Sequence, residues 1–153
     1  PIMGRAAQGQ PALRLSKQEE VVGCVALTTA DNLLLISTQG HSKRMPVSAI
    51  KALKRGEIGV QSMQFANKLD KLAGIALAAD DMEVKILTDI NRMARLLPEK
   101  IPLQGRTGSG ECLLKLDKKE KVAELIVAYL PPNAANQIAE DSSSGSAYTS
   151  DPE

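Results

Sequence analysis

Short runs of apolar or alternating residues, separated by turn residues, dominate the pattern of this chain. In its first half the runs cover residues 21–28, 33–38, 41–45 and 60–65. A period of two, with Asp, Asn and Gly at the boundaries, is typical of β-strands joined by tight turns. Pro46 ends the third run because proline has no N–H to donate to a neighbouring strand, and residues 47–53 are expected to form one helical turn. The pattern predicts an all-β chain.

The chain also repeats itself at an offset of 51 residues. The segment V-G-C-V-A-L at 22–27 aligns with A-G-I-A-L-A at 73–78. Without a gap, the same offset places Gly40 opposite Asn91, and both residue types tolerate the positive φ of a tight hairpin. Repeated groups of short strands predict propeller-like blades rather than a helical solenoid. The motif R-x-x-x-G occurs three times, beginning at Arg5, Arg55 and Arg106.

These repeats define the expected domain organisation. We predict blades of four antiparallel strands over residues 1–130, amounting to about two full blades plus flanking strands. The repeat units cover about 17–66 and 67–117, with partial copies at 4–16 and 118–130. A chain beginning at Pro1 is expected to be part of a longer protein. The acidic, Ser-rich residues 131–153 offer few apolar anchors and are predicted to form a disordered tail.

Charge is distributed unevenly along the chain. Residues 1–130 hold all 19 lysines and arginines and 14 of the 18 acidic residues, whereas 131–153 hold the other four acidic residues. A basic body of this kind favours a polyanionic partner. Aromatic residues make up only 2% of the chain, so the usual stacking platforms for single-stranded nucleic acid are missing.

Several kinds of site find no support in the sequence. Cys24 and Cys112 form no CxxC pair and are expected in the core, so we predict neither a disulfide framework nor a metal site. His41 is the only histidine and has no acidic residue at a catalytic spacing, so we predict no catalytic residue and no cofactor. The glycine-rich segment 105–110 is expected to form a turn, because it lacks a following Gly-Lys-Ser/Thr and precedes a strand. No apolar run is long enough to span a membrane and no leader is visible, so a cytoplasmic location is expected.

Residues 32–50, N-L-L-L-I-S-T-Q-G-H-S-K-R-M-P-V-S-A-I, resemble the blade repeat in the C-terminal domain of the DNA gyrase A subunit. The segments G-R-x-x-x-G at 4–9 and 105–110 match a further part of that repeat, and the resemblance covers roughly residues 4–129. It implies a β-pinwheel, in which neighbouring blades exchange a strand. The glutamine-, arginine- and glycine-rich box Q-R-R-G-G-K-G of gyrase is absent, and Leu97 stands opposite Pro46. The A subunit of topoisomerase IV therefore stays open as an alternative.

The resemblance also implies a function. Family members bind and wrap double-stranded DNA around a positively charged outer rim, and in gyrase this supports ATP-dependent negative supercoiling. The parent protein is expected to pair with itself and with the gyrase B subunit in an A2B2 assembly, near the bacterial nucleoid. This region itself carries no catalytic activity in the family.

Basic residues that recur at one place in the repeat are the candidate DNA contacts. Duplex DNA presents one negative charge about every 1.7 Å, so a wrapping surface needs cations repeated along a path. Arg44 and Arg95 share one register position in the repeat, and Arg5, Arg55 and Arg106 share another. The further candidates are Lys43, Lys51, Lys54 and Arg92. The arginines of the R-x-x-x-G motif have an alternative role as bridges between blades. The alternative for the whole chain is a propeller that binds other proteins; a hydrolase or nucleotide-binding enzyme ranks third for want of a catalytic constellation.

Overall fold

The structure, a computed structural model, describes residues 2–28, 31–79 and 82–129. The regular elements in these ranges are β-strands and two short 3-10 turns, so the predicted all-β fold is confirmed. None of the described residues forms a helix that could cross a membrane. The tail predicted at 131–153 lies outside the described residues.

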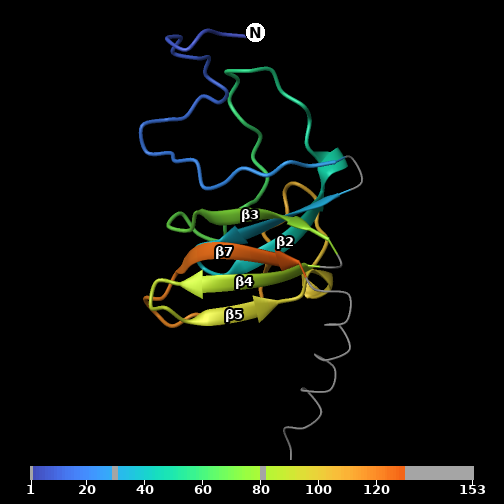
Figure 1. The fold of residues 1–153 in the computed structure, drawn as a ribbon. Coiled ribbons are helices and arrows are strands. Elements are labelled where there is room, and N and C mark those ends of the chain that lie inside the picture. The colour runs from blue at the N-terminus through green and yellow to red at the C-terminus, as the bar shows by residue number, and fades with distance from the viewer. Residues whose placement is uncertain (1, 29–30, 80–81, 130–153) are drawn as a thin grey trace, which may run out of the picture.

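Each of the two sheets contains one β-hairpin of the same design (Figure 1). The first joins β1 (Asn32–Ser37) to β2 (His41–Pro46), and the second joins β4 (Met82–Thr88) to β5 (Met93–Leu96). Each hairpin turn holds one residue at positive φ, with 84° at Gly40 and 61° at Asn91. The alignment of these two positions in the repeat is therefore confirmed. The 3-10 turns η1 (Val47–Ala49) and η2 (Pro98–Lys100) follow β2 and β5, and η1 confirms the predicted helical turn.

Each hairpin is completed by strands from the next unit of the repeat. The first sheet has the order β3-β1-β2-β6, in which β3 (Leu72–Ala78) and β6 (Glu111–Cys112) both belong to the second unit. The second sheet has the order β5-β4-β7, and β7 (Val122–Tyr129) pairs with β4 as β3 pairs with β1. All of these pairings are antiparallel. The strand exchange implied by the resemblance is thus present.

Two of the predicted strands are wrong: residues 21–28 and 60–65 form no strand. They correspond in the repeat to β3 and to the β6 region, which pair with β1 and β2. Among the described residues, no hairpin precedes β1, so residues 21–28 and 60–65 have no hairpin with which to pair. Cys24 is consequently exposed, and Cys112 on the short β6 is exposed as well, so neither lies in the core as expected.

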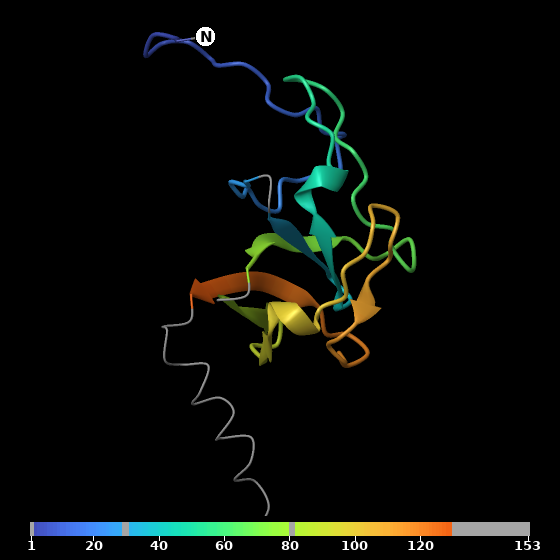
Figure 2. The same cartoon turned by 90° about the vertical axis from the view of Figure 1, so that its right-hand side faces the viewer.

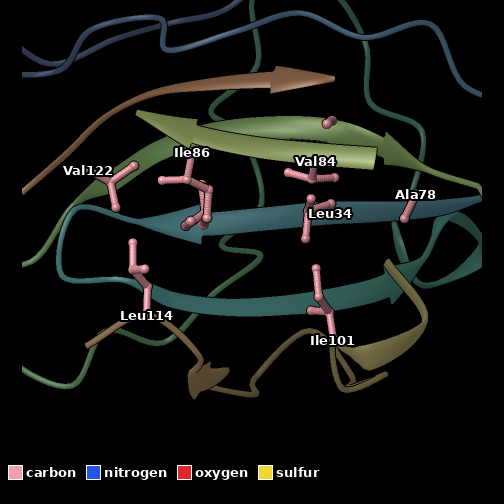
Figure 3. Packing of buried hydrophobic residues seen from close by; sticks show 9 residues of the cluster. Leu34, Ala78, Val84, Ile86, Ile101, Leu114 and Val122 are labelled. Atoms are coloured by element: carbon pink, nitrogen blue, oxygen red, sulfur yellow. The ribbon is translucent and has the colours of Figure 1, made fainter. Parts of the chain in front are cut away.

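The main core lies between the two sheets. Leu34 of β1 lies between Ile101 on one side and Val84 and Ile86 of β4 on the other (Figure 3). Leu34, Val84, Ile86 and Ile101 are each at most 1% exposed. Burial of apolar surface contributes roughly 25 cal/mol per Å² removed from water, so this contact stabilises the two sheets against each other.

A second cluster covers the opposite face of the first sheet. Leu33, Leu35, Met45 and Met63 are its buried members. Residues of 21–28 and 60–65, among them Val25, Leu27 and Phe65, pack against it. These two segments therefore bury apolar side chains without pairing as strands. They lead into the N-terminal lobe (residues 2–20 and 51–59), which lies above the sheets in Figure 1.

Replacing Gly40 by Ala is expected to lower the free energy of unfolding by about 2 kcal/mol. The residue has a φ of 84°, and an added Cβ would lie 2.8 Å from the carbonyl oxygen of Leu114. Asn91→Gly is the matched control, since it changes the equivalent position without adding atoms, and its effect is expected to stay within about 0.5 kcal/mol. Urea unfolding followed by circular dichroism measures both; equal effects of the two changes would contradict the argument.

Candidate nucleic-acid interface

One turn design occurs three times, at 4–7, 54–57 and 105–108. In each turn the N–H of the fourth residue donates to the carbonyl oxygen of the first, at 3.1, 3.4 and 3.1 Å. The second residue of each turn is the arginine that opens an R-x-x-x-G motif, and it is exposed in all three. The repeat therefore presents a guanidinium at the tip of the same turn in each copy. These residues are Arg5, Arg55 and Arg106.

The first two of these turns belong to the N-terminal lobe, and the second of them is bonded to residues 12–14. The N–H of Gly56 donates to the carbonyl oxygen of Ala12 at 3.2 Å, and the N–H of Arg14 donates to that of Glu57 at 3.3 Å. Lys54 opens the second turn and is exposed, as is Lys51 just before it. In Figure 2 the turn at 54–57 lies in the upper part of the molecule, and the gold 101–110 segment lies lower, on the right-hand side.

Lys43 binds the carbonyl oxygens of the third turn. Its side chain is fully buried, and Nζ donates to the carbonyl oxygens of Gly105, Arg106 and Gly108 at 2.8, 3.1 and 2.9 Å. Desolvation by burial lowers the pKa of the Lys43 ammonium below its ordinary value. This burial contradicts the predicted DNA contact of Lys43, which instead ties the loop of the second unit to β2 of the first.

Arg44, the next residue, fastens the 3-10 turn of the following unit. Its Nε donates to the carbonyl oxygen of Ile101 at 2.8 Å. One of its terminal nitrogens donates to the carbonyl oxygen of Glu99 at 3.5 Å. The backbone of Arg44 also bonds to Pro102 and Gln104. The bridging of units that the sequence suggested for other arginines is thus performed by Arg44. Its contact with DNA stays a prediction.

Arg95, the repeat partner of Arg44, has different surroundings. It forms an ion pair with Glu83 on the outer face of the second sheet, where the arginine side chain is 57% exposed and the carboxylate 7%. The two arginines that share a register position therefore do not share a partner. A phosphate that approached Arg95 would have to compete with Glu83.

Arg92 is engaged by a buried carboxylate. Its Nε and one terminal nitrogen donate to the two oxygens of Glu120 at 2.8 and 2.7 Å, and the latter nitrogen also donates to the carbonyl oxygen of Lys115. The Glu120 side chain is only 1% exposed. The Arg92 side chain is itself 44% exposed, and a phosphate that approached it would have to compete with this bidentate pair. The DNA contact of Arg92 stays a prediction.

Asp70 and His41 form the corresponding contact in the first sheet. Asp70 is the last residue of the turn N-K-L-D, as Glu120 is the last residue of D-K-K-E, and its side chain is likewise 1% exposed. Its Oδ1 accepts from the Thr38 hydroxyl at 2.8 Å, whereas its Oδ2 lies 3.9 Å from His41 Nδ1. Neither of the latter two atoms has a hydrogen-bond partner among the described residues. Sequence reasoning missed this recurring acidic turn.

Glu120→Gln is expected to remove part of the pH dependence of stability. Bonding to Arg92 lowers the pKa of Glu120 below its ordinary value. Because the folded pKa is the lower one, the stabilising contribution is complete above the ordinary pKa and is lost as the pH falls through the folded value. Urea midpoints measured from about pH 7 to about pH 3 should therefore fall less steeply in the variant than in the wild type. Parallel curves would contradict this role.

A shallow, polar cleft adjoins the third turn. It has a volume of about 670 Å³ and lies between the 60–66 segment and the 104–109 loop. No cluster of His, Cys, Asp or Glu in the part of the chain that the structure describes could hold a metal ion. The lining consists mainly of small and amide side chains: Gln64, Phe65, Ala66, Gln104, Gly105, Thr107, Gly108 and Ser109.

Strand exchange between hairpins and an exposed arginine at each repeated turn define an all-β repeat module of the propeller class. Comparison with known families agrees with this class. The model of the "DNA gyrase C-terminal domain, beta-propeller" family matches residues 1–28, 31–79 and 86–128, and the chain belongs to this family.

Individual relatives and structures support the same assignment. The DNA gyrase A subunit of Aminobacterium colombiense is 32% identical over 121 residues, which are 79% of this chain and 15% of that protein. The chain thus spans about 15% of the length of such relatives. A crystal structure of the C-terminal domain of DNA topoisomerase IV superimposes with a TM-score of 0.72 at 14% identity, over 86% of this chain and 41% of that one. A DNA gyrase A C-terminal domain gives 0.57 at 26% identity, over 65% and 33%.

Proposed function

We propose that this module binds double-stranded DNA along its repeated basic turns and wraps it for the A subunit of a type IIA topoisomerase. The observation that carries the proposal is the exposed arginine at the second position of the same turn in three copies of the repeat. Phosphates recur at a fixed spacing along a duplex, so a repeated turn suits a backbone contact that needs no particular sequence. Lys54, the first residue of the second turn, and Lys51, which precedes this turn, add two further exposed positive charges.

The resulting contact set differs from the one expected from sequence. Arg5, Arg55 and Arg106 become the principal contacts, because their guanidinium groups stand at exposed turn tips. Arg44 and Arg95 become secondary contacts, since each has an internal partner. Binding should be driven mainly by release of counterions from DNA, with weak sequence preference.

The longer protein is proposed to belong to a DNA gyrase-like, ATP-hydrolysing type II topoisomerase that introduces negative supercoils. In this proposal it pairs with itself and with the gyrase B subunit in an A2B2 assembly, in the cytoplasm at the nucleoid. This module supplies DNA contact without a cofactor or catalytic residue, and other parts of the enzyme perform cleavage and ATP hydrolysis. The A subunit of topoisomerase IV is the alternative parent.

Replacing Arg5, Arg55 and Arg106 together by Ala tests DNA binding. Each lost phosphate contact is expected to reduce the slope of log K against log salt by about 0.9, so the triple variant should lose roughly 2–3 units of slope. The measurement is fluorescence anisotropy with a duplex of about 40 base pairs, at about 50–200 mM salt. Wrapping is measured separately, as the change in linking number after a relaxed plasmid is closed in the presence of the protein.

A triple variant of equal charge provides the control. Lys68, Lys118 and Lys119 are exposed on the turns that carry the acidic residues Asp70 and Glu120. Changing these three lysines to Ala should leave most of the slope intact. Equal losses in both variants would contradict a localised surface. No binding by the wild type would favour the protein-interaction alternative, for which Met93 and Ile126, 58% and 38% exposed, offer an apolar surface.

A further inference from the structure

The loop at 105–109 has an unusual backbone arrangement. Three of its carbonyl oxygens, those of Gly105, Arg106 and Gly108, converge on the single buried ammonium of Lys43. The loop is anchored on the same side by Gln64, whose N–H donates to the carbonyl oxygen of Gly108 at 3.2 Å. The three carbonyl oxygens on the interior side of the loop therefore all accept hydrogen bonds already.

Peptide geometry then fixes the other side of the loop. A trans peptide is planar, and its N–H points opposite to its C=O; none of the described peptide bonds is cis. The N–H groups that follow the three bonded carbonyls belong to Arg106, Thr107 and Ser109, and they must point away from Lys43. Within the described residues these three N–H groups donate no hydrogen bond, and all three residues are exposed.

The side chains on this loop have matching chemistry. The guanidinium of Arg106 and the hydroxyls of Thr107 and Ser109 are all donors. Gln104 supports the loop from within, because its Oε1 accepts from the N–H of Gly110 at 2.9 Å. The carboxylate nearest in sequence, Glu111, is the first residue of β6, whose backbone pairs with Ser42. The Ser109 hydroxyl donates to the carbonyl oxygen of Gly110 at 3.5 Å, so the donors that remain on the loop are three N–H groups, the Thr107 hydroxyl and the guanidinium of Arg106.

We infer that residues 105–109 form a binding loop for one phosphate of the DNA backbone, with Lys43 as its positioning residue. The inference rests on the proposed function and refines it, because backbone amides and not only arginine side chains would hold the phosphate. Groups of outward-pointing amides are well suited to anions. Gly105 has no side chain to cover the amides and no atom lies within 4 Å of where its Cβ would be, whereas a Cβ at Gly108 would collide with Gln104, so Gly108 lets the loop pack against that side chain. The loop therefore does more than form the turn expected from its sequence.

The turn at 54–57 shows why this loop is distinct. There the N–H of Gly56 already donates to Ala12, and the carbonyl oxygen of Glu57 accepts from Arg14. Neither that turn nor the one at 4–7 holds a lysine ammonium against its carbonyls among the described residues. The arginine is common to all three turns, whereas the orientation of amides by a buried cation is confined to the third.

Comparing Arg106→Pro with Arg106→Ala measures the contribution of the Arg106 backbone N–H to DNA binding. Both variants lack the guanidinium, but only proline lacks the N–H, and proline is favoured at the second position of a β-turn. Arg106→Ala should reduce the salt slope of duplex binding by about 1. Relative to Arg106→Ala, Arg106→Pro should bind a further three- to tenfold more weakly with the same slope, in keeping with about one hydrogen bond. Equal affinities of the two variants would overturn the inference.

Amide chemical shifts of the wild type give a test that needs no variant. Titration with duplex DNA should move the amide protons of Arg106, Thr107 and Ser109 downfield, and those of the 4–7 turn much less. Inorganic phosphate in place of DNA should move the same three amides weakly. Movement with free phosphate alone, or DNA binding that leaves the three amides unmoved, would overturn the loop while the proposed function stands. Absence of DNA binding would overturn both.

Discussion

A Lys43→Met protein is expected to be less stable than the wild type by about 2–4 kcal/mol. The change keeps the length of the side chain but removes the ammonium from three carbonyl oxygens, which leaves these acceptors without their charged donor. The same variant is expected to bind duplex DNA several-fold more weakly, although Lys43 is buried and contacts no solvent. The measurements are urea unfolding and fluorescence anisotropy with a duplex.

Lys119→Met is the matched control, because Lys119 is exposed and its side chain donates no hydrogen bond to the other described residues. Its stability should stay within about 0.5 kcal/mol of the wild type. If both variants unfold at the same urea concentration, the buried ammonium has no structural role. If Lys43→Met is destabilised and DNA affinity is unchanged in conditions where it remains folded, Lys43 supports the fold without positioning the loop.

Ile86→Ala is expected to cost about 3–4 kcal/mol of unfolding free energy. Ile86 is fully buried in the cluster that joins the two sheets, so its truncation leaves a cavity against β1 as well as within β4 (Figure 3). Because every sheet depends on the neighbouring unit, the loss should appear as one shifted transition rather than as selective melting of the second sheet. Thermal unfolding with a calorimeter would show this.

Ile90→Ala provides the comparison for this second prediction. Ile90 lies in the β4–β5 turn and is 58% exposed, so its truncation should change stability by no more than about 0.5 kcal/mol. Two separate transitions in the Ile86→Ala protein would contradict the view that the sheets unfold together.

The hairpins could be predicted because their signals are local. Gly40 and Asn91 occupy equivalent turns, and the alternating runs around them fold back on their neighbours in sequence. Residues 21–28 carry the same pattern as β3 and yet form no strand, since strand formation needs a hairpin alongside. An alternating pattern shows that a segment is suited to a β-sheet, but it does not show that a partner strand is available. Which segments pair as strands could therefore not be predicted from the sequence.

The candidate site shows the same limit at the level of single side chains. Lys43 and Arg44 are adjacent basic residues, but one is buried under a loop and the other fastens a turn, through partners about 60 residues away. Lys43 shares its side of β2 with the buried Met45, and this alternation was the available signal. The acidic turns N-K-L-D-K and D-K-K-E-K repeat at an offset of 50, one residue from the offset of the hairpins, and so they escaped a comparison without gaps.

The exchange of β3 and β7 between units has a consequence for how such proteins change length. If the protein gained or lost one whole repeat unit, each hairpin would still be followed by a strand that can pair with it. This holds because every unit supplies that strand at the same position in the repeat. The number of blades can therefore change during evolution without leaving an unpaired strand edge between blades. An insertion or deletion that is not a whole number of repeat units would leave a hairpin without its closing strand.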